Sequence, residues 1–264
     1  MSETRKLTQK LFPLVPQYRE RVWGGQKLKA CEPPVGEAWV AFDESRVREG
    51  THEGRTVAEL AAEYGAQLLG AEVAAEHGTR FPLLVKLLDC ADWLSVQVHP
   101  DDEQAARLVG AGECGKTEAW HFLEVEPGAE IIAGVREGTT AGALERAIRE
   151  GRVFDVAERR GVRAGETVLI PAGTLHSLGP GLLLYELQQS SDTTFRVYDW
   201  DRPASDGRKL HVEESVAVAD ARKVALRASP PTLAGTSAVS AMKCRFFTLD
   251  VLQVAADAPL KCDT

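Results

Sequence analysis

No stretch of the sequence is apolar for long enough to cross a membrane. A membrane-spanning helix needs about 20 consecutive apolar residues, and no window of the chain approaches that length. The N-terminal residues, MSETRKLTQKLFPLV, also lack the apolar core of a secretion signal. We therefore expect a cytoplasmic protein.

Clustered positive charge is missing as well. Lys and Arg number 31 against 39 Asp and Glu, a net charge of −8, and no basic run offsets this balance. Nucleic acid and anionic lipid surfaces attract positive charge. The composition therefore predicts neither nucleic acid nor a membrane as a partner.

Cysteine is sparse and shows no pairing pattern. The five cysteines contain no C-x-x-C pair, so neither a disulfide framework nor a thiolate zinc site is predicted. The sequence also has no repeat of solenoid period and no low-complexity tract.

Short strands separated by Gly, Pro and Asp turns are the main pattern that is present. Apolar runs such as AEIIAGV, ETVLIPA and GLLLYELQ read as strands, and many such strands predict a sandwich or barrel. Three helices are expected, over residues 56–70, over residues 139–151, and in DDEQAARLV after Pro100. The 264 residues, 44% of them hydrophobic, suffice for one large β domain or two smaller ones.

Four residues at particular spacings indicate a metal site. Gln97 and His99 in LSVQVHPDD lie two apart, so on a strand both side chains point to the same face. Glu118 lies in GKTEAW. His176 ends the pattern G-x5-P-x-G-x2-H, which is the second cupin motif and predicts a cupin jelly roll. Two imidazoles, a carboxylate and an amide favour zinc and leave manganese, cobalt or ferrous iron open.

The sequence around these residues resembles the type I mannose-6-phosphate isomerases of the short bacterial kind. The similar blocks cover most of residues 20–205 and run VWGGQKL, VGEAWVAFDES, FPLLVKLLDCADWLSVQVHPDDEQA, GKTEAWHFLEVEPGAEIIAGV and VLIPAGTLHSLGPGLLLYELQQSSDTTFRVYDWDR. The resemblance implies one zinc ion per chain, bound by Gln97, His99, Glu118 and His176. It implies interconversion of mannose 6-phosphate and fructose 6-phosphate through a cis-enediol.

The resemblance also suggests which side chains act on the sugar phosphate. Arg196, Lys116 and Asp192 are the expected catalytic residues. The expected substrate-binding residues are Lys86, Ser95, Trp23 and Glu37. Alternatives stay open: Lys86 could be an edge or surface lysine, and Asp192 a turn residue. No residue identifies itself as the base that moves the proton.

Domain organisation is expected to change after residue 222. We predict a catalytic cupin domain over residues 1–222, a linker over 223–239 and the beginning of a smaller, cupin-like β domain over 240–264, apparently incomplete at Thr264. The expected partner is a sugar phosphate, and the protein is expected to be a monomer or a homodimer.

Two other functions are compatible with such a scaffold. Two histidines and a carboxylate also form the iron site of non-haem oxygenases, although a fourth ligand and the cations Lys116 and Arg196 disfavour that interpretation. The other is a sugar-phosphate-binding protein without turnover, since a fold does not determine a function.

Overall fold

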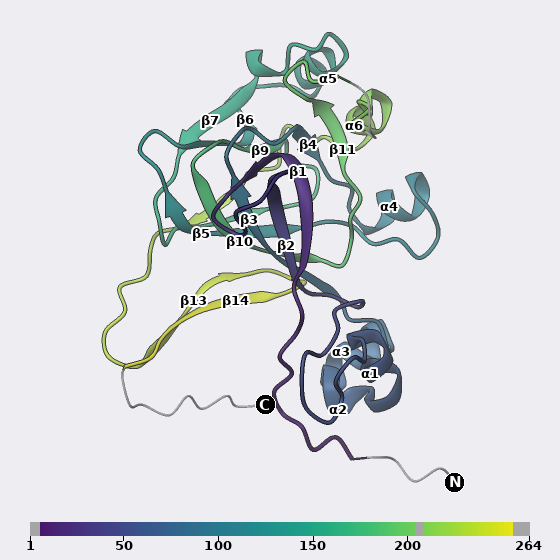
Figure 1. Ribbon diagram of the computed structural model, residues 1–264. Coiled ribbons are helices and arrows are strands. Elements are labelled where there is room, and N and C mark those ends of the chain that lie inside the picture. Colours follow the sequence, from purple (N-terminus) through teal and green to yellow (C-terminus); the bar gives the residue numbers. More distant parts are fainter. Residues whose placement is uncertain (1–5, 204–207, 256–264) are drawn as a thin grey trace.

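Two antiparallel sheets form the body of the protein (Figure 1). The computed structural model describes residues 6–203 and 208–255. Within these residues the large sheet has seven strands in the order β1 (Gln17–Gly25), β2 (Val35–Ala41), β3 (Leu83–Cys90), β10 (Leu182–Gln189), β5 (Glu118–Val125), β8 (Thr167–Ile170) and β12 (Leu226–Ala228). The small sheet has the order β11 (Phe195–Tyr198), β4 (Val96–Val98), β9 (His176–Leu178), β6 (Glu130–Val135) and β7 (Ala157–Gly161).

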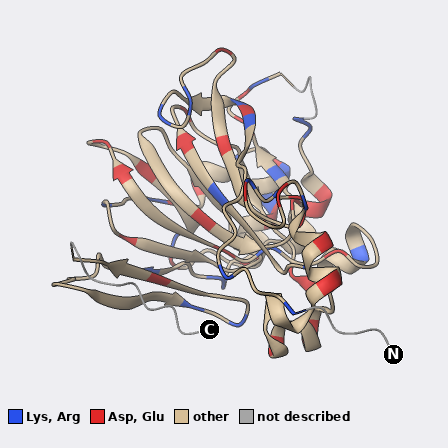
Figure 2. Cartoon of the chain, turned by 60° about the horizontal axis from the view of Figure 1, so that its bottom comes forward, with Lys and Arg blue, Asp and Glu red and all other residues tan. Residues whose placement is uncertain are grey.

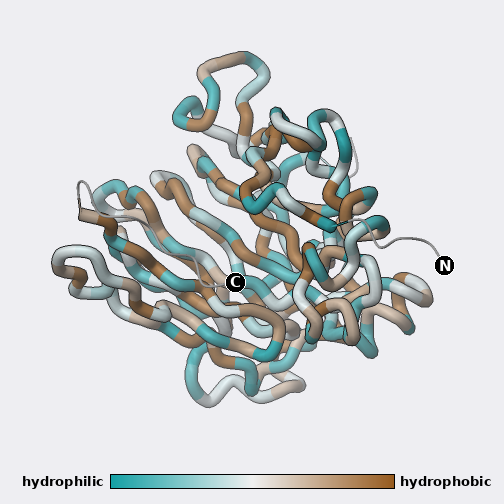
Figure 3. Tube along the Cα trace, turned by 90° about the horizontal axis from the view of Figure 1, so that it is seen from below, coloured by the Kyte–Doolittle hydropathy of each residue, from teal (hydrophilic) through white to brown (hydrophobic). Residues whose placement is uncertain are grey.

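The main hydrophobic core lies between these sheets. Trp120, Phe122 and Leu184 project from the large sheet and meet Ile131 and Leu178 of the small sheet, each 1% exposed or less. Burying a side chain of this size contributes roughly 1.5–3 kcal/mol. Apolar and polar positions alternate along many strands (Figure 3), as expected for strands with one buried face. The all-β expectation is therefore confirmed.

The first expected helix is divided in the structure. Thr56 caps α1 (Val57–Tyr64) through a reciprocal pair of hydrogen bonds with Glu59. The helix ends at Gly65, whose φ of 49° and ψ of −120° lie outside the helical region. Two further helices, α2 (Ala66–Leu69) and α3 (Ala71–His77), follow it. The prediction of one continuous helix over residues 56–70 was therefore wrong, because the chain changes direction at Gly65 and again at Gly70.

The other two expected helices are confirmed. Asp101 caps α4 (Asp102–Leu108) and Thr140 caps α5 (Ala141–Arg149). A 3-10 turn over Val153–Asp155 and helix α6 (Val212–Val218) complete the helical elements among the described residues. None of these helices has the length and apolar character needed to span a membrane.

The region after residue 222 differs from the expected linker. Strand β12 falls inside residues 223–239, yet it pairs with β8 at the edge of the large sheet. Strands β13 (Ser237–Lys243) and β14 (Thr248–Gln253) then form a hairpin below the sheets in Figure 1. Met242, Phe247 and Leu249 of this segment pack against Val85 and Leu187 on the outer face of the large sheet. The sequence does not predict β12, because this short segment is a strand only through its backbone hydrogen bonds with β8.

Candidate metal centre

Three buried side chains from three strands converge at one point. His99 directly follows β4, Glu118 begins β5, and His176 begins β9. His99 Nε2 lies 3.4 Å from Glu118 Oε2, and His176 Nε2 lies 3.4 Å from Glu118 Oε1. The two Nε2 atoms are 3.1 Å apart, and all three side chains are 1% exposed or less.

Strand register explains why residues distant in sequence meet here. On the small sheet, Gln97 of β4 pairs with His176 of β9 on one side and with Arg196 of β11 on the other. Gln97 is partly buried and lines the adjoining cavity. The pairing therefore places the fourth predicted ligand opposite His176 on the neighbouring strand.

The three converging residues fit a divalent cation such as zinc. His176 Nδ1 lies 2.8 Å from the carbonyl oxygen of Thr174, so Nδ1 carries the proton and Nε2 presents a lone pair, as in most zinc-bound histidines. Burial lowers the pKa of His99 to about 3, assisted by the charge of Lys116, and burial also lowers the pKa of His176. Both imidazoles are therefore neutral. The Glu118 oxygens receive no hydrogen bond from the described residues, and Lys116 Nζ lies 3.2 Å from Oε2. A metal cation would satisfy the remaining acceptor capacity of this buried carboxylate.

A cavity of about 360 Å³ adjoins this cluster. The eight other predicted site residues all line it: Trp23, Glu37, Lys86, Ser95, Gln97, Lys116, Asp192 and Arg196. Lys86 is 4% exposed on a central strand, so the surface-lysine alternative was wrong. Asp192 is exposed at the cavity margin, and Trp23 also packs into the main core. The structure brings the predicted residues together, and their individual roles stay predictions.

Alternating charges cross one wall of the cavity. Arg21 donates two hydrogen bonds to Glu37, of 3.0 and 3.1 Å. Lys86 Nζ lies 3.3 Å from Glu186 Oε1, and these residues face each other across β3 and β10. Figure 2 shows basic and acidic positions as separate bands along the strands. Because the charges alternate, each buried group has an opposite charge beside it.

Two carboxyls on this wall titrate in opposite directions. Burial raises the pKa of Glu37, but the charges of Lys86 and Arg21 outweigh burial, and its pKa is lowered overall. Burial and the nearby Glu118 charge raise the pKa of Glu186. The Trp120 indole donates to Glu186 Oε2 at 3.1 Å. Glu186 is thus a buried carboxyl with increased proton affinity that faces the cavity.

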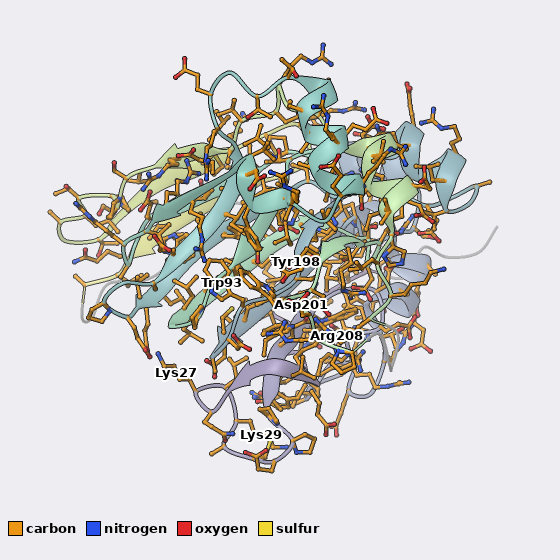
Figure 4. All side chains as sticks on the ribbon, turned by 90° about the horizontal axis from the view of Figure 1, so that it is seen from above. Lys27, Lys29, Trp93, Tyr198, Asp201 and Arg208 are labelled. Carbon is orange, nitrogen blue, oxygen red and sulfur yellow. The ribbon has the colours of Figure 1, made fainter. Side chains whose placement is uncertain are left out.

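Arginines form the opposite side of the cavity. Arg208 donates to both oxygens of the buried Asp199 carboxylate, and Arg196 Nη1 donates to the Lys209 carbonyl at 3.1 Å. Figure 4 labels Tyr198, the last residue of β11, together with Asp201 and Arg208 from the segment after it. The cavity thus has a cationic side at β11 of the small sheet and the segment after it, while the alternating charges belong to the large sheet.

Several residues of the cavity were missed from the sequence: Arg21, Glu186, Thr194, Arg208 and His211. One signal could have identified Glu186. It interrupts the apolar run GLLLYEL just as Lys86 interrupts FPLLVKL, and a charged residue in a buried strand usually requires a partner. The sequence carries no comparable signal for Arg208 or His211.

The lowered pKa of Glu37 predicts a pH-dependent stability. A carboxyl whose pKa is lowered by folding stabilises the protein above its ordinary pKa of 4.5, and this contribution is lost as the pH falls through the lowered value. We expect Glu37→Gln to cost about 2 kcal/mol at pH 7, because charge-assisted hydrogen bonds are lost. Urea unfolding of both proteins from pH 7 to pH 3 should show this difference shrinking below pH 4.5. A difference independent of pH would contradict the assignment.

Comparison with known proteins gives one consistent result. Residues 11–121 match the family described as phosphomannose isomerase type I, catalytic domain. The mannose-6-phosphate isomerase of Streptococcus mutans is 37% identical over 259 residues, which cover 93% of this chain and 79% of that protein. The crystal structure of the mannose 6-phosphate isomerase from Bacillus subtilis superposes with a TM-score of 0.81 at 33% identity, over 92% of this chain and 79% of that one.

A zinc-bound structure shares the fold at greater distance. A mannose 6-phosphate isomerase in its zinc-bound holo form superposes with a TM-score of 0.60 at 17% identity, over 79% of this chain and 74% of that one. With the Bacillus subtilis structure, this confirms the expected cupin fold.

Proposed function

This chain belongs to the type I phosphomannose isomerase family, and from that premise we propose that it interconverts mannose 6-phosphate and fructose 6-phosphate with one zinc ion per chain. The observation that carries the proposal is a buried His99, Glu118 and His176 cluster beside a cavity lined by cations. A metal site alone serves many reactions. The adjoining positive charge is what suits a phosphorylated sugar.

We assign the zinc ion to His99, Glu118 and His176, with Gln97 as the fourth ligand. When bound, zinc polarises a carbonyl or hydroxyl oxygen of the sugar. The described chain supports this assignment through the His176 tautomer and through the buried Glu118 oxygens.

The proton transfer needs a group that can accept and return a proton. Isomerisation removes the proton from C2 of the aldose, forms a cis-enediol and places a proton on C1. Glu186 suits this step because its carboxyl is buried, faces the cavity and has a raised pKa. We therefore propose Glu186 as the base, which the sequence alone did not identify.

Cations beside Glu186 can hold the negative charge that develops on the enediol oxygens. Lys116 Nζ is 3.2 Å from Glu118 Oε2, and Lys86 is buried next to Glu186. Fixed charges in a site with little water stabilise such an intermediate strongly. Trp23, Leu88 and Leu94 supply apolar lining that limits the access of water.

We assign the phosphate group to the cationic side, at Arg196 and Arg208. Each guanidinium lines the cavity and is held by the chain, Arg196 through the Lys209 carbonyl and Arg208 through Asp199. Guanidinium groups held in place in this way match the geometry of phosphate oxygens. Asp192 at the margin is proposed to orient Arg196.

One experiment separates this function from its rivals. The purified protein is mixed with fructose 6-phosphate, and mannose 6-phosphate is measured with and without a chelator. Turnover that requires metal and consumes no oxygen supports the isomerase. Binding without turnover would favour a sugar-phosphate-binding protein, and oxygen uptake would favour an oxygenase.

Removing Arg196 should weaken catalysis measurably. We expect Arg196→Ala to lower kcat/KM about 30-fold, on the order of 2 kcal/mol, because a charge-assisted contact is lost. A loss confined to KM assigns Arg196 to the phosphate, whereas a fall in kcat assigns it to the developing charge. Arg136 is the matched control, since it also donates to backbone carbonyls but is exposed and lies outside the cavity. Steady-state kinetics of Arg196→Ala equal to those of Arg136→Ala would exclude both roles.

Three predictions about the whole protein remain proposals. We propose a cytoplasmic location, with a sugar phosphate rather than nucleic acid or a membrane as the partner, and a monomeric or homodimeric state. We also propose that residue 240 begins a second, smaller β domain; residues 256–264, which the prediction included, lie outside the described residues. The β13–β14 hairpin supports this division because its two strands pair only with each other among the described residues.

A further inference from the structure

A network of hydrogen bonds holds the backbone on either side of Lys116. The segment Gly115–Thr117 precedes β5 and lies outside the regular sheet. The Gly115 amide donates to Asp102 Oδ1 at 2.8 Å, and the Thr117 amide donates to Gln189 Oε1 at 3.0 Å. The Lys116 amide donates to the Pro100 carbonyl at 3.0 Å. Three consecutive amides are therefore bonded to two other segments, residues 100–102 before and at the start of α4 and Gln189 at the end of β10.

The side chain of Gln189 joins two of these partners. Its Oε1 accepts from Thr117, and its Nε2 donates to Asp102 Oδ1 at 3.0 Å. Its own amide also donates to the Thr117 carbonyl at 3.2 Å. Gln189 is 6% exposed, so loss of these bonds would leave buried polar groups without partners.

The network links all the segments that carry the proposed metal ligands. Pro100 follows His99, and Thr117 precedes Glu118. The Thr117 hydroxyl also accepts from the amide of Ala172, in the turn that leads to His176. Because Lys116 lies within Gly115–Thr117 and lines the cavity, a small displacement of that segment would move its side chain relative to the cavity.

Close backbone contact leaves this segment little freedom. A Cβ added to Gly115 would lie 2.6 Å from the Asp101 carbonyl carbon and 2.7 Å from the Asp102 nitrogen. Contacts this short with backbone atoms do not occur without displacement. The absence of a side chain at Gly115 thus lets the segment Gly115–Thr117 approach the start of α4, close enough for Asp102 to accept a hydrogen bond from the Gly115 amide.

We infer that Gln189 and Asp102 are positioning residues for Lys116, a role that rests on the proposed isomerase function. Neither residue touches the sugar in this assignment. Through its hydrogen bonds to Asp102 and Thr117, Gln189 holds the backbone of Lys116 in place and so determines the position of the Lys116 ammonium relative to the enediol oxygens. Positioning of this kind affects kcat, since modest misplacement of a charged group weakens transition-state stabilisation.

The first test replaces the amide by an apolar group of similar size. Gln189→Leu should lower kcat at least tenfold, with KM within threefold of wild type and zinc content unchanged. Hydrogen exchange at the amides of Gly115 and Thr117 should become at least tenfold faster, and exchange at Ala105 in α4 should stay the same. Gln104→Ala is the matched control, because it removes one side-chain bond from the cap of the same helix and should leave kcat and these amides unchanged.

A rescue distinguishes positioning from general stability. Gln189→Glu keeps an acceptor for Thr117 but places a carboxylate against Asp102, so kcat should fall. Adding Asp102→Asn removes the repulsion between the two carboxylates and supplies an amide N–H group that can donate to the new carboxylate at position 189. The paired variant should recover kcat to within threefold of wild type. If Gln189→Leu does not fold, the comparison of Gln189→Glu with the paired variant still tests whether Gln189 positions Lys116.

The outcomes separate this inference from the proposed function. Unchanged amide exchange in Gln189→Leu, or faster exchange with wild-type kcat, would overturn the inference while wild-type turnover stands. Loss of zinc, or a parallel change of kcat and KM without rescue, would reduce Gln189 to a structural role and also overturn it. A wild-type protein without isomerase activity would refute the function, and therefore the assignment to Lys116.

Discussion

His176→Ala is expected to lose both the metal and the activity. Purified wild-type protein should contain about one zinc ion per chain, and the variant almost none, because the imidazole is one of two in the buried cluster. We expect kcat/KM to fall at least a thousandfold, about 4 kcal/mol in transition-state stabilisation. Elemental analysis and steady-state kinetics on the same preparations measure both quantities.

A second histidine provides the matched control. His121 also belongs to β5, three residues after Glu118, but its Nδ1 bonds to the Thr167 hydroxyl at 2.9 Å, and it does not line the cavity. His121→Ala should keep the zinc ion and most of the activity. His176→Gln preserves more of the side-chain volume in a fully buried position and should also lose zinc. Full metal content and rate in both His176 variants would remove His176 from the metal site.

Glu186→Gln is expected to lower kcat at least a hundredfold while zinc stays bound. General acid–base groups contribute about 10²–10⁴ in rate, and a hundredfold corresponds to about 2.7 kcal/mol. The amide can still accept the indole hydrogen bond of Trp120 but cannot take up a proton. KM should change little, because the arginines assigned to the phosphate lie on the other side of the cavity.

Isotope exchange tests the same assignment independently. Turnover in heavy water should place solvent deuterium at C2 of mannose 6-phosphate or C1 of fructose 6-phosphate, because the base exchanges its proton with solvent before returning it. In Glu186→Gln, deuterium should be incorporated no faster than the slowed formation of product. Glu166→Gln is the control, since Glu166 is a buried carboxylate paired with Arg227 outside the cavity. A wild-type rate in Glu186→Gln would exclude Glu186 as the base.

Part of the site could be predicted because strand geometry is local. A spacing of two places Gln97 and His99 on one face, and the second cupin motif places His176 at the start of a strand. The structure brings these residues together with Glu118. The family resemblance added Lys116 and Arg196, which line the cavity as expected.

Residues that depend on pairing between distant strands could not be found in this way. Glu186 faces the cavity because β10 lies between β3 and β5, which places its carboxylate beside Lys86 and Trp120. No short sequence pattern specifies that order. Strand β12 was missed for the same reason, since its backbone hydrogen bonds come from β8.

The sequence by itself determined the types of the proposed metal ligands, the spacing of Gln97 and His99, and the capped helices α4 and α5, because these are properties of neighbouring residues. Only the tertiary structure decided which charges share the cavity and which polar groups restrain them. Gln189 and Asp102 are 87 residues apart, and their contact with the Lys116 segment exists only once both sheets have formed. Side chains from distant strands acquire their pKa values and their partners through burial, which a linear pattern does not contain.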